Sequence, residues 1–353
     1  MTPTAKLATL LTALTIAATP AALTTPAHAH TPPPAPATTG HHIDPRPSTA
    51  ELTHRLHQLH DHSNGRIRIT EIGRTNQNRP IYHATVGTGP RRLLYITQQH
   101  GNEPLGTPAA LEFLRHTGLG TTPWHHWLRS RITVDIIVRA NPDGHENNSR
   151  YNHDPHADPE HGRKGKGYDP NRYHHPNLHP DHNPVPEAAA IQRTYAATTP
   201  DLVVDYHMQG RYTDHHGREI TASVMWPTHP DVTTPATDLS RQATVAAAHA
   251  ITTHHPANNV STYPGGDYPG IARNAYGLHG SGSILIELSN IGPHAEQRQI
   301  RSALAAMTAI AQRTADTSLT RIDPARADRI PPRGAPIPTH ERTPTPDHTD
   351  TLD

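Results

Sequence analysis

The chain has 353 residues, which is enough for one large domain or two ordinary ones. Lys and Arg together number 31, and so do Asp and Glu, so the formal net charge is zero and gives no support for a nucleic-acid partner or for polybasic membrane binding. The absence of Cys excludes disulfides, thiolate nucleophiles and Cys-based zinc sites. With 32 His residues, a single His is weak support for a metal ligand.

The N-terminal stretch has the pattern of a secretory signal. Lys6 is followed by an apolar run rich in Ala, Leu and Thr, and then by Ala27, His28 and Ala29, an A-x-A sequence of the kind that signal peptidases cut after. The apolar run is too short for a transmembrane helix, which needs about 20 residues. We predict a cleaved signal peptide over residues 1–29 and a secreted protein without stable membrane association; a disordered Ala/Thr-rich tail is the alternative.

The rest of the chain divides by composition. Residues 30–47 are Pro-rich and are predicted to be a linker. Ser48 and Glu51 form an S-x-x-E capping box ahead of spaced Leu residues, which predicts a helix at the start of a domain over residues 48–316. Residues 317–353 are rich in Pro, Thr and Arg and are predicted to be disordered.

Apolar runs typical of strands alternate with segments of helical periodicity inside that domain. We expect strands over residues 66–71, 81–86, 93–97, 132–138, 202–206 and 284–288, and helices over residues 108–116, 187–197, 236–253 and 295–315. This alternation predicts an α/β fold with a mostly parallel or mixed sheet. Residues 140–185 form a long polar segment, and so long a loop in a compact domain is usually functional.

The first candidate metal ligands follow the apolar run 93–97. His100 and Glu103 in "HGNE" lie between that expected strand and the next helix, at the carboxyl end of a strand, where α/β sheets usually bind ligands. A second H-x-x-E match, His216 to Glu219, has no apolar run before it and is attributed to the abundance of His. A two-residue motif of this kind does not by itself establish a metal site.

A third candidate ligand ends another apolar run. His207 in "DLVVDYHMQG" occupies the same kind of position as His100, and neighbouring strand ends could bring both onto one ion with Glu103. Two imidazoles and one carboxylate, with the fourth position open to water, make a catalytic rather than a structural zinc site. A strand-end His that is hydrogen-bonded to a loop is the alternative for His207.

Further motifs extend this set, in one order along the chain. They are "HGNEP" from His100, "NPDG" at residues 141–144, Arg150, "DPNR" at residues 169–172, His207 and "ILIEL" around Glu287. Together they resemble the zinc carboxypeptidases of the carboxypeptidase A type (M14 family). The resemblance implies a single α/β domain with a mixed, mostly parallel eight-stranded sheet flanked by helices, one zinc ion, and hydrolysis of C-terminal peptide bonds, with peptide or protein C-termini as substrates. We further expect a monomer.

The resemblance also implies roles for residues outside the ligand set. Glu287 matches the general acid/base, and an acidic residue that is not a ligand is what proton transfer from water to the leaving amine requires; a strand-end Glu in a salt bridge is the alternative. Asp169 matches the aspartate that orients the first zinc histidine. Arg150 matches the arginine that stabilises the tetrahedral oxyanion.

The expected substrate-binding residues distinguish a carboxypeptidase from an endopeptidase or amidase with the same zinc centre. Asn171 and Arg172 match the pair that binds the terminal carboxylate of the substrate. Pro170 replaces the usual apolar residue and should hold Asp169 in extended geometry. Tyr268 is the preferred match for the mobile tyrosine that closes over the substrate.

Two other tyrosines, Tyr263 and Tyr276, are alternatives to Tyr268 for that closing role, because all three precede Glu287. Arg273 falls in the segment that lines the specificity pocket of relatives, where it would favour an acidic substrate side chain; a surface Arg is the alternative reading.

Two other functions share parts of this pattern. One is a zinc amidohydrolase or endopeptidase acting on N-acyl amino acids or cell-wall peptides, against which the Asn171–Arg172 pair favours a free terminal carboxylate. The other is an inactive zinc-dependent peptide-binding module, which would be expected to lack Glu287 or a ligand.

Overall fold

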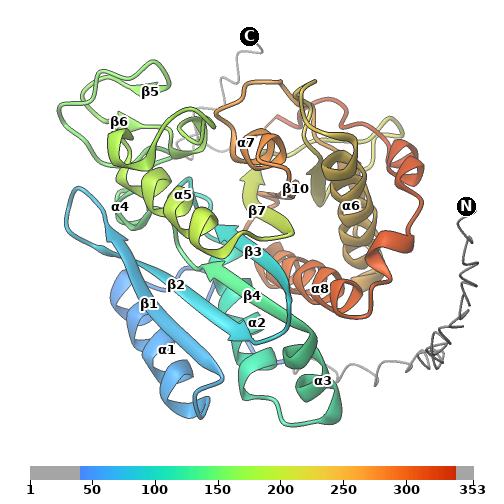
Figure 1. The fold of residues 1–353 in the computed structure, drawn as a ribbon. Helices are drawn as coiled ribbons and strands as arrows, with labels where there is room; N and C mark the ends of the chain where they lie inside the picture. Colours follow the sequence, from blue (N-terminus) through green and yellow to red (C-terminus); the bar gives the residue numbers. More distant parts are fainter. Residues whose placement is uncertain (1–39, 339–353) are drawn as a thin grey trace, which may run out of the picture. The chain divides into compact units, whose positions relative to one another are not determined.

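The computed structural model describes residues 40–338. The predicted signal peptide, the first part of the predicted linker and residues 339–353 lie outside the described residues. An eight-stranded sheet in the order β1-β2-β4-β3-β7-β10-β8-β9 forms the centre of the domain (Figure 1). Its strands are β1 (Ile67–Arg74), β2 (Pro80–Gly87), β3 (Arg91–Thr97), β4 (Ile132–Ile137), β7 (Leu202–Gln209), β8 (Ala222–Met225), β9 (Val260–Thr262) and β10 (Gly282–Ser289).

The four central strands, β4, β3, β7 and β10, are parallel to their neighbours in that group. The pairs β1–β2, β2–β4 and β8–β10 are antiparallel, and β8 and β9 are parallel. The sheet is therefore mixed, with a parallel centre, as the sequence predicts. Parallel strands align their carboxyl ends at one edge, and β3, β7 and β10 are adjacent in the sheet. This arrangement brings together the three segments that carry the expected site.

Helices cover both faces of the sheet, because alternate residues of the central strands point to opposite sides. Leu93 and Tyr95 belong to one apolar cluster, whereas Leu94 and Ile96 belong to the other. The helices of the first face are α1 (Thr49–His62), α2 (Gly106–Leu119), α3 (Pro123–Arg131), α6 (Thr234–His254) and α8 (Glu296–Ala315), and those of the second are α5 (Pro186–Thr198) and α7 (Ala272–Leu278) (Figure 1).

The six predicted strands and the four predicted helices are all present, with ends that differ by a few residues. The predicted capping box is also formed, because the Ser48 hydroxyl accepts a hydrogen bond from the Glu51 N–H and the Glu51 carboxylate accepts one from the Ser48 N–H. Strands β8 and β9 were not predicted, because they are too short to show the alternation of apolar and polar residues that is typical of a strand. Their pairing partners, not their own sequences, make them strands.

The ends of the domain differ from the prediction. The predicted disorder from residue 317 is wrong for residues 317–338, which contain short 3-10 helices at Leu319–Arg321 and Pro324–Arg329. Leu319 and Ala327 are buried, so this segment packs on the domain despite its polar composition. The end of the predicted linker also packs, because Ile43 is buried and both its backbone polar groups bond to the Gln297 side chain.

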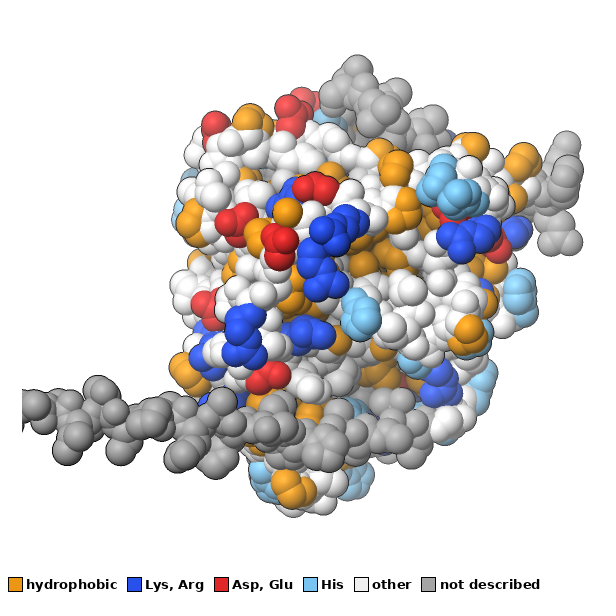
Figure 2. Space-filling view, turned by 90° about the vertical axis from the view of Figure 1, so that its right-hand side faces the viewer, with side chains coloured by type: hydrophobic (Ala, Val, Ile, Leu, Met, Phe, Trp, Pro, Cys, Tyr) orange, Lys and Arg blue, Asp and Glu red, His pale blue; other side chains and the backbone are white. Residues whose placement is uncertain are grey.

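Among residues 40–338, no helix combines the length and the apolar character that crossing a bilayer requires. On the face shown in Figure 2, Lys and Arg side chains lie among Asp, Glu and His side chains.

Candidate zinc centre

The loop between β3 and α2 places the first two candidate ligands. His100 and Glu103 are both buried there, and the Glu103 N–H donates to the His100 carbonyl, which closes a tight turn. Gly101 allows a close approach in this turn, because a Cβ atom at that position would lie only 1.9 Å from the Gly144 carbonyl carbon. The HGNE turn therefore packs directly against the NPDG turn.

The NPDG turn begins the long polar segment and is held by its first residue. The Asn141 side-chain oxygen accepts from the Gly144 N–H at 2.7 Å, and its amide nitrogen donates to the Gln99 carbonyl at 3.0 Å. After a single short helix, α4 (Pro142–Glu146), the Asn102 N–H donates to the Ser149 carbonyl. These bonds bring Arg150, the next residue, next to the two candidate ligands.

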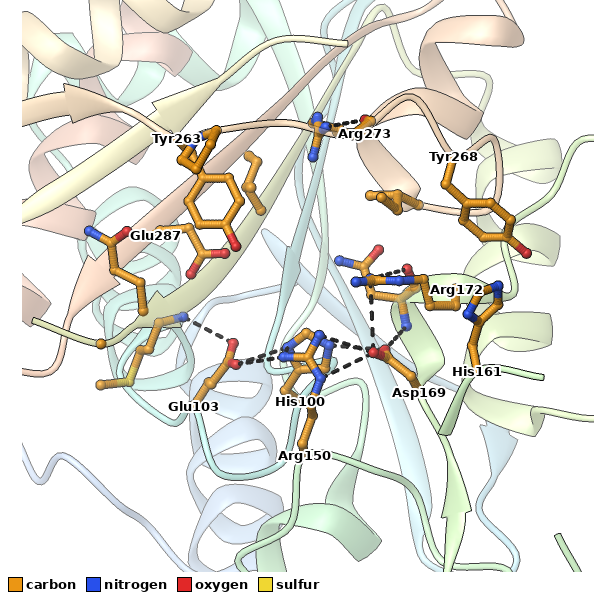
Figure 3. A pocket seen from close by; sticks show the side chains of 18 of the residues that line it. His100, Glu103, Arg150, His161, Asp169, Arg172, Tyr263, Tyr268, Arg273 and Glu287 are labelled. Carbon is orange, nitrogen blue, oxygen red and sulfur yellow. Dashed lines mark hydrogen bonds and ion pairs between the residues drawn. The ribbon is translucent and has the colours of Figure 1, made fainter. Parts of the chain in front are cut away.

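The three predicted ligands converge. The Nδ1 atoms of His100 and His207 are 3.0 Å apart, and each lies 2.9 Å from a different carboxylate oxygen of Glu103. Figure 3 shows His100 and Glu103 facing each other in the cavity. One donor atom from each residue lies within 4.8 Å of the other two, and all three residues are buried. Such a set of polar groups, facing one another inside the protein, is what a shared cation requires.

Each histidine turns its other ring nitrogen to an aspartate. The Nε2 atom of His100 lies 3.0 Å from Asp169, and the Nε2 atom of His207 lies 2.8 Å from Asp205. Such carboxylate partners fix the tautomer and orientation of a metal-binding histidine. The first aspartate was predicted. The second was missed, although it stands two residues before His207 in a strand, where residues i and i+2 share a face.

A buried network supports that second aspartate. The Gln99 side-chain nitrogen donates to Asp205 at 2.7 Å, the Gln99 oxygen lies 2.6 Å from the His174 Nε2 atom, and His174 Nδ1 lies 3.0 Å from the Tyr276 hydroxyl. Burial lowers the pKa of His174 to about 4, so this imidazole is neutral in the network. Tyr276 is therefore part of the buried support and does not face the substrate pocket.

The donor set fits one zinc ion. Two imidazole nitrogens and one carboxylate, each held by an outer hydrogen-bond partner, are a catalytic zinc set. The Glu103 carboxylate also accepts from the Met208 N–H at 3.0 Å. Within residues 40–338 this is the one group of His, Asp and Glu side chains close enough to share an ion. In the second H-x-x-E match, Glu219 instead pairs with Arg211.

Glu287 lies in β10 directly opposite His207 of β7 in the parallel register. Residues in register on adjacent strands share a face of the sheet, so the Glu287 carboxylate lies on the side of the zinc ligands (Figure 3). It lines the same cavity of about 760 Å³ as His100 and Glu103, and it is 7% exposed. The Glu287 carboxylate is therefore close to the candidate ligands without belonging to their group.

Arg150 and Asp169 form an ion pair beside the ligands. The guanidinium makes contacts of 3.0 and 3.1 Å with the Asp169 carboxylate, and its Nη1 atom lies 3.7 Å from Glu103. Burial raises the pKa of Asp169, but Arg150, Arg172 and His100 outweigh it and hold that pKa well below its usual range. Asp169 is thus an anion that orients both an imidazole and a guanidinium.

Arg172 and Asn171, the predicted carboxylate-binding pair, both line the cavity. Arg172 lies 3.8 Å from Asp169. The Asn171 side chain is buried, accepts from the Ala272 N–H at 2.8 Å and lies 3.1 Å from the His207 Nε2 atom, so it ties the start of α7 to the zinc centre. As predicted from Pro170, the backbone at Asp169 is extended.

The expected closing tyrosine, Tyr268, packs edge to face on His161 beside Arg172 (Figure 3). Tyr263 lines the same cavity on the opposite side and points toward Glu287. The closing role of Tyr268 stays a prediction, and Tyr263 is the tyrosine nearer to the predicted general base. Arg273 is buried in the cavity wall, where it donates to the Gly266 carbonyl at 2.7 Å and to the Thr228 hydroxyl at 3.1 Å.

A mixed α/β sheet that presents two histidines and a glutamate at the carboxyl ends of its parallel strands, beside a further carboxylate, defines a zinc hydrolase. The sequence profile of the zinc carboxypeptidase (M14) family matches residues 52–303. The chain therefore belongs to the zinc carboxypeptidase family, with an intact His-Glu-His zinc-binding triad. No curated protein sequence matches the chain.

Solved structures share the fold at low sequence identity. Bovine thrombin-activatable fibrinolysis inhibitor aligns with a TM-score of 0.60 and 15% identity, over 78% of this chain and 98% of that chain. Carboxypeptidase A from Helicoverpa armigera aligns with a TM-score of 0.60 and 17% identity, over 78% and 74%. A metallo-carboxypeptidase from Burkholderia cenocepacia gives 0.56 and 18%, over 74% and 69%. These matches confirm the predicted fold class.

Proposed function

We propose that this protein is a secreted metallocarboxypeptidase that removes residues one at a time from the C-termini of peptides or proteins. The observation that carries the proposal is the content of one cavity. His100 and Glu103 of the zinc-binding set, the carboxylate of Glu287 and the guanidinium of Arg172 all line it. A guanidinium held at a fixed position beside a hydrolytic centre selects substrates that carry a terminal carboxylate.

His100, Glu103 and His207 would hold the zinc ion. When bound, zinc polarises the scissile carbonyl and lowers the pKa of water. Glu287 accepts a proton from the attacking water and delivers it to the nitrogen of the leaving residue. Its carboxylate is available for this transfer because it is not a metal ligand. Its position opposite His207 in the sheet register supports this role.

Arg150 stabilises the negative charge that develops on the carbonyl oxygen. Its guanidinium forms ion pairs with the carboxylates of Asp169 and Glu103, so it is already in position when the substrate binds. Arg172 binds the terminal carboxylate of the substrate. The buried Asn171 side chain supports this arrangement, because it hydrogen-bonds both to His207 and to the first residue of α7.

The test uses matched peptides with purified, zinc-loaded protein. Each peptide is supplied with a free C-terminus and as its C-terminal amide, and the products are followed by mass spectrometry, with Glu287→Gln as the inactive control. Stepwise trimming of the free acids alone is the expected result. Internal cleavage of both forms would favour an amidohydrolase or endopeptidase, and no cleavage of either would favour a binding module.

Secretion rests on the N-terminal sequence, with Lys6, the apolar run and the A-x-A site that ends at Ala29. Expression of the full chain in a secreting host tests it. We expect the protein in the medium with an N-terminus near His30, and retention of the whole chain inside the cell would contradict the proposal.

A further inference from the structure

A segment near the C-terminus lies beside the zinc centre, although it follows the part of the chain that the family profile matches, residues 52–303. We call residues 331–337 the C-terminal strap. Its backbone is bonded to β9 and to the loop after β7: Arg333 N–H donates to the Thr262 carbonyl at 3.1 Å, and Gly334 N–H donates to the Thr213 carbonyl at 2.8 Å. The Ile337 N–H donates to the Arg211 carbonyl at 2.8 Å. The strap is therefore held at both ends.

The side chain of Arg333 reaches from the strap into the wall of the catalytic cavity. Its guanidinium carbon lies 3.7 Å from the ring centre of Tyr212 and 4.5 Å from that of Tyr263. Its Nη1 atom donates to the Gln209 side-chain oxygen at 3.0 Å. Two aromatic contacts and one hydrogen bond hold this guanidinium in one orientation.

Arg333 differs from the other arginines of the cavity in its partners. Arg150 and Arg172 lie near the Asp169 carboxylate. Within the part of the chain that the structure describes, no carboxylate lies within ion-pair distance of Arg333, whose hydrogen bond goes to a neutral amide. A guanidinium has five N–H groups, so most of those on Arg333 remain for a ligand.

The position of Arg333 relative to Arg172 sets which part of a substrate it meets. In Figure 3, Arg172 and Tyr268 lie on one side of the zinc ligands, and Tyr263 and Glu287 lie on the other. Arg333 packs on Tyr263 and therefore belongs to the second side. A peptide whose terminal carboxylate binds Arg172 and whose scissile carbonyl lies at the metal centre extends from there toward Arg333.

We propose that Arg333, oriented by Tyr212 and Gln209, forms a subsite for an acidic side chain located one or two residues before the scissile bond. This inference rests on the proposed function, because it takes Arg172 as the site of the terminal carboxylate. A carboxylate pairs with two N–H groups along one edge of the guanidinium, and the tyrosines that pack on its plane keep that edge in place. The enzyme would therefore trim acidic peptides faster than neutral ones with the same last residue.

The test compares peptides that share the last residue and differ only in Glu or Gln at each of the two preceding positions. We expect kcat/KM of the native enzyme to be about tenfold higher for Glu than for Gln at one position. Arg333→Met, which keeps an unbranched apolar stem between the tyrosines, should remove that preference and leave the Gln peptides within about twofold. Arg333→Lys should keep part of it.

Arg326→Met is the matched control, because Arg326 is exposed on the same C-terminal segment and does not line the cavity. It should leave the preference unchanged. Equal rates for Glu and Gln peptides with the native enzyme, or an equal loss for both in Arg333→Met at normal zinc content, would overturn the subsite. If the native enzyme trims no free acid at all, the proposed function fails first, and the two failures are therefore distinguishable.

Discussion

Glu287 and His207 stand directly opposite each other in the parallel register of β10 and β7, one as the predicted proton carrier and the other as a zinc ligand. Because the sheet hydrogen bonds set this register, the separation of base and metal does not depend on a mobile loop. β10 also pairs with β8 on its other edge, where Glu287 lies opposite Ser223. Strand pairing on both sides therefore fixes the backbone position of Glu287.

Glu287→Gln should keep zinc and lose turnover. The amide has the same shape, and Glu287 is outside the group of converging ligands, but an amide cannot accept the proton of water. We expect kcat to fall by about 10³-fold or more, with the zinc content of the purified protein unchanged by metal analysis. Loss of zinc in this variant would show that Glu287 is a ligand after all.

Asp205→Asn should weaken zinc binding. Asp205 accepts from the Nε2 side of His207 and from Gln99, so its charge sets both the tautomer and the orientation of this ligand. We expect the zinc dissociation constant, measured by competition with a chelating dye, to rise about 10- to 100-fold. The exposed Asp231→Asn is the control. An unchanged affinity would restrict Asp205 to a packing role.

Arg172→Ala should affect free acids and amides differently. Removing a charge-assisted contact to a carboxylate costs about 1.5 to 3 kcal/mol, so kcat/KM for free-acid peptides should fall about 10- to 100-fold. Residual cleavage of the amidated peptides should stay nearly constant. A parallel loss for both kinds of peptide would count against Arg172 as the carboxylate-binding residue.

Glu187→Gln should change how stability depends on pH. Glu187 is fully buried at the start of α5, with one carboxylate oxygen bonded to Asn152, and burial raises its pKa from 4.5 to about 7. As pH rises from about 4.5 to about 7, the unfolded chain loses this proton while the folded protein keeps it. The folded state of the native protein is therefore penalised progressively over that window, and Glu187→Gln is not.

The measurement for Glu187→Gln is urea unfolding of both proteins between about pH 5 and pH 8. The free energy of unfolding of the variant, relative to the native protein, should increase over this range by about 2 kcal/mol. Using the difference cancels the contributions of the many histidines, which are common to both proteins. A pH-independent difference would mean that Glu187 titrates normally in the folded state.

Much of the site follows from local sequence. The strand that precedes His100 and the strand that carries His207 can both be predicted, because the pattern of apolar residues extends over only a few positions. The order of the motifs was enough to predict the zinc ligands, Asp169 and the fold. The long segment 140–185 was expected to be functional, and it supplies Arg150, Asp169 and Arg172 to the cavity.

Contacts between distant segments were decided only by the tertiary structure. Short β8 and β9 are strands because their neighbours pair with them. Arg333 reaches the cavity because the C-terminal strap bonds to β9, although its polar, Pro-rich sequence predicts disorder. Such a segment has no periodicity of its own, since it gains order from the backbone groups and aromatic rings it meets. The sequence thus determined the chemistry of the metal centre, and the packing of the chain determined what surrounds it.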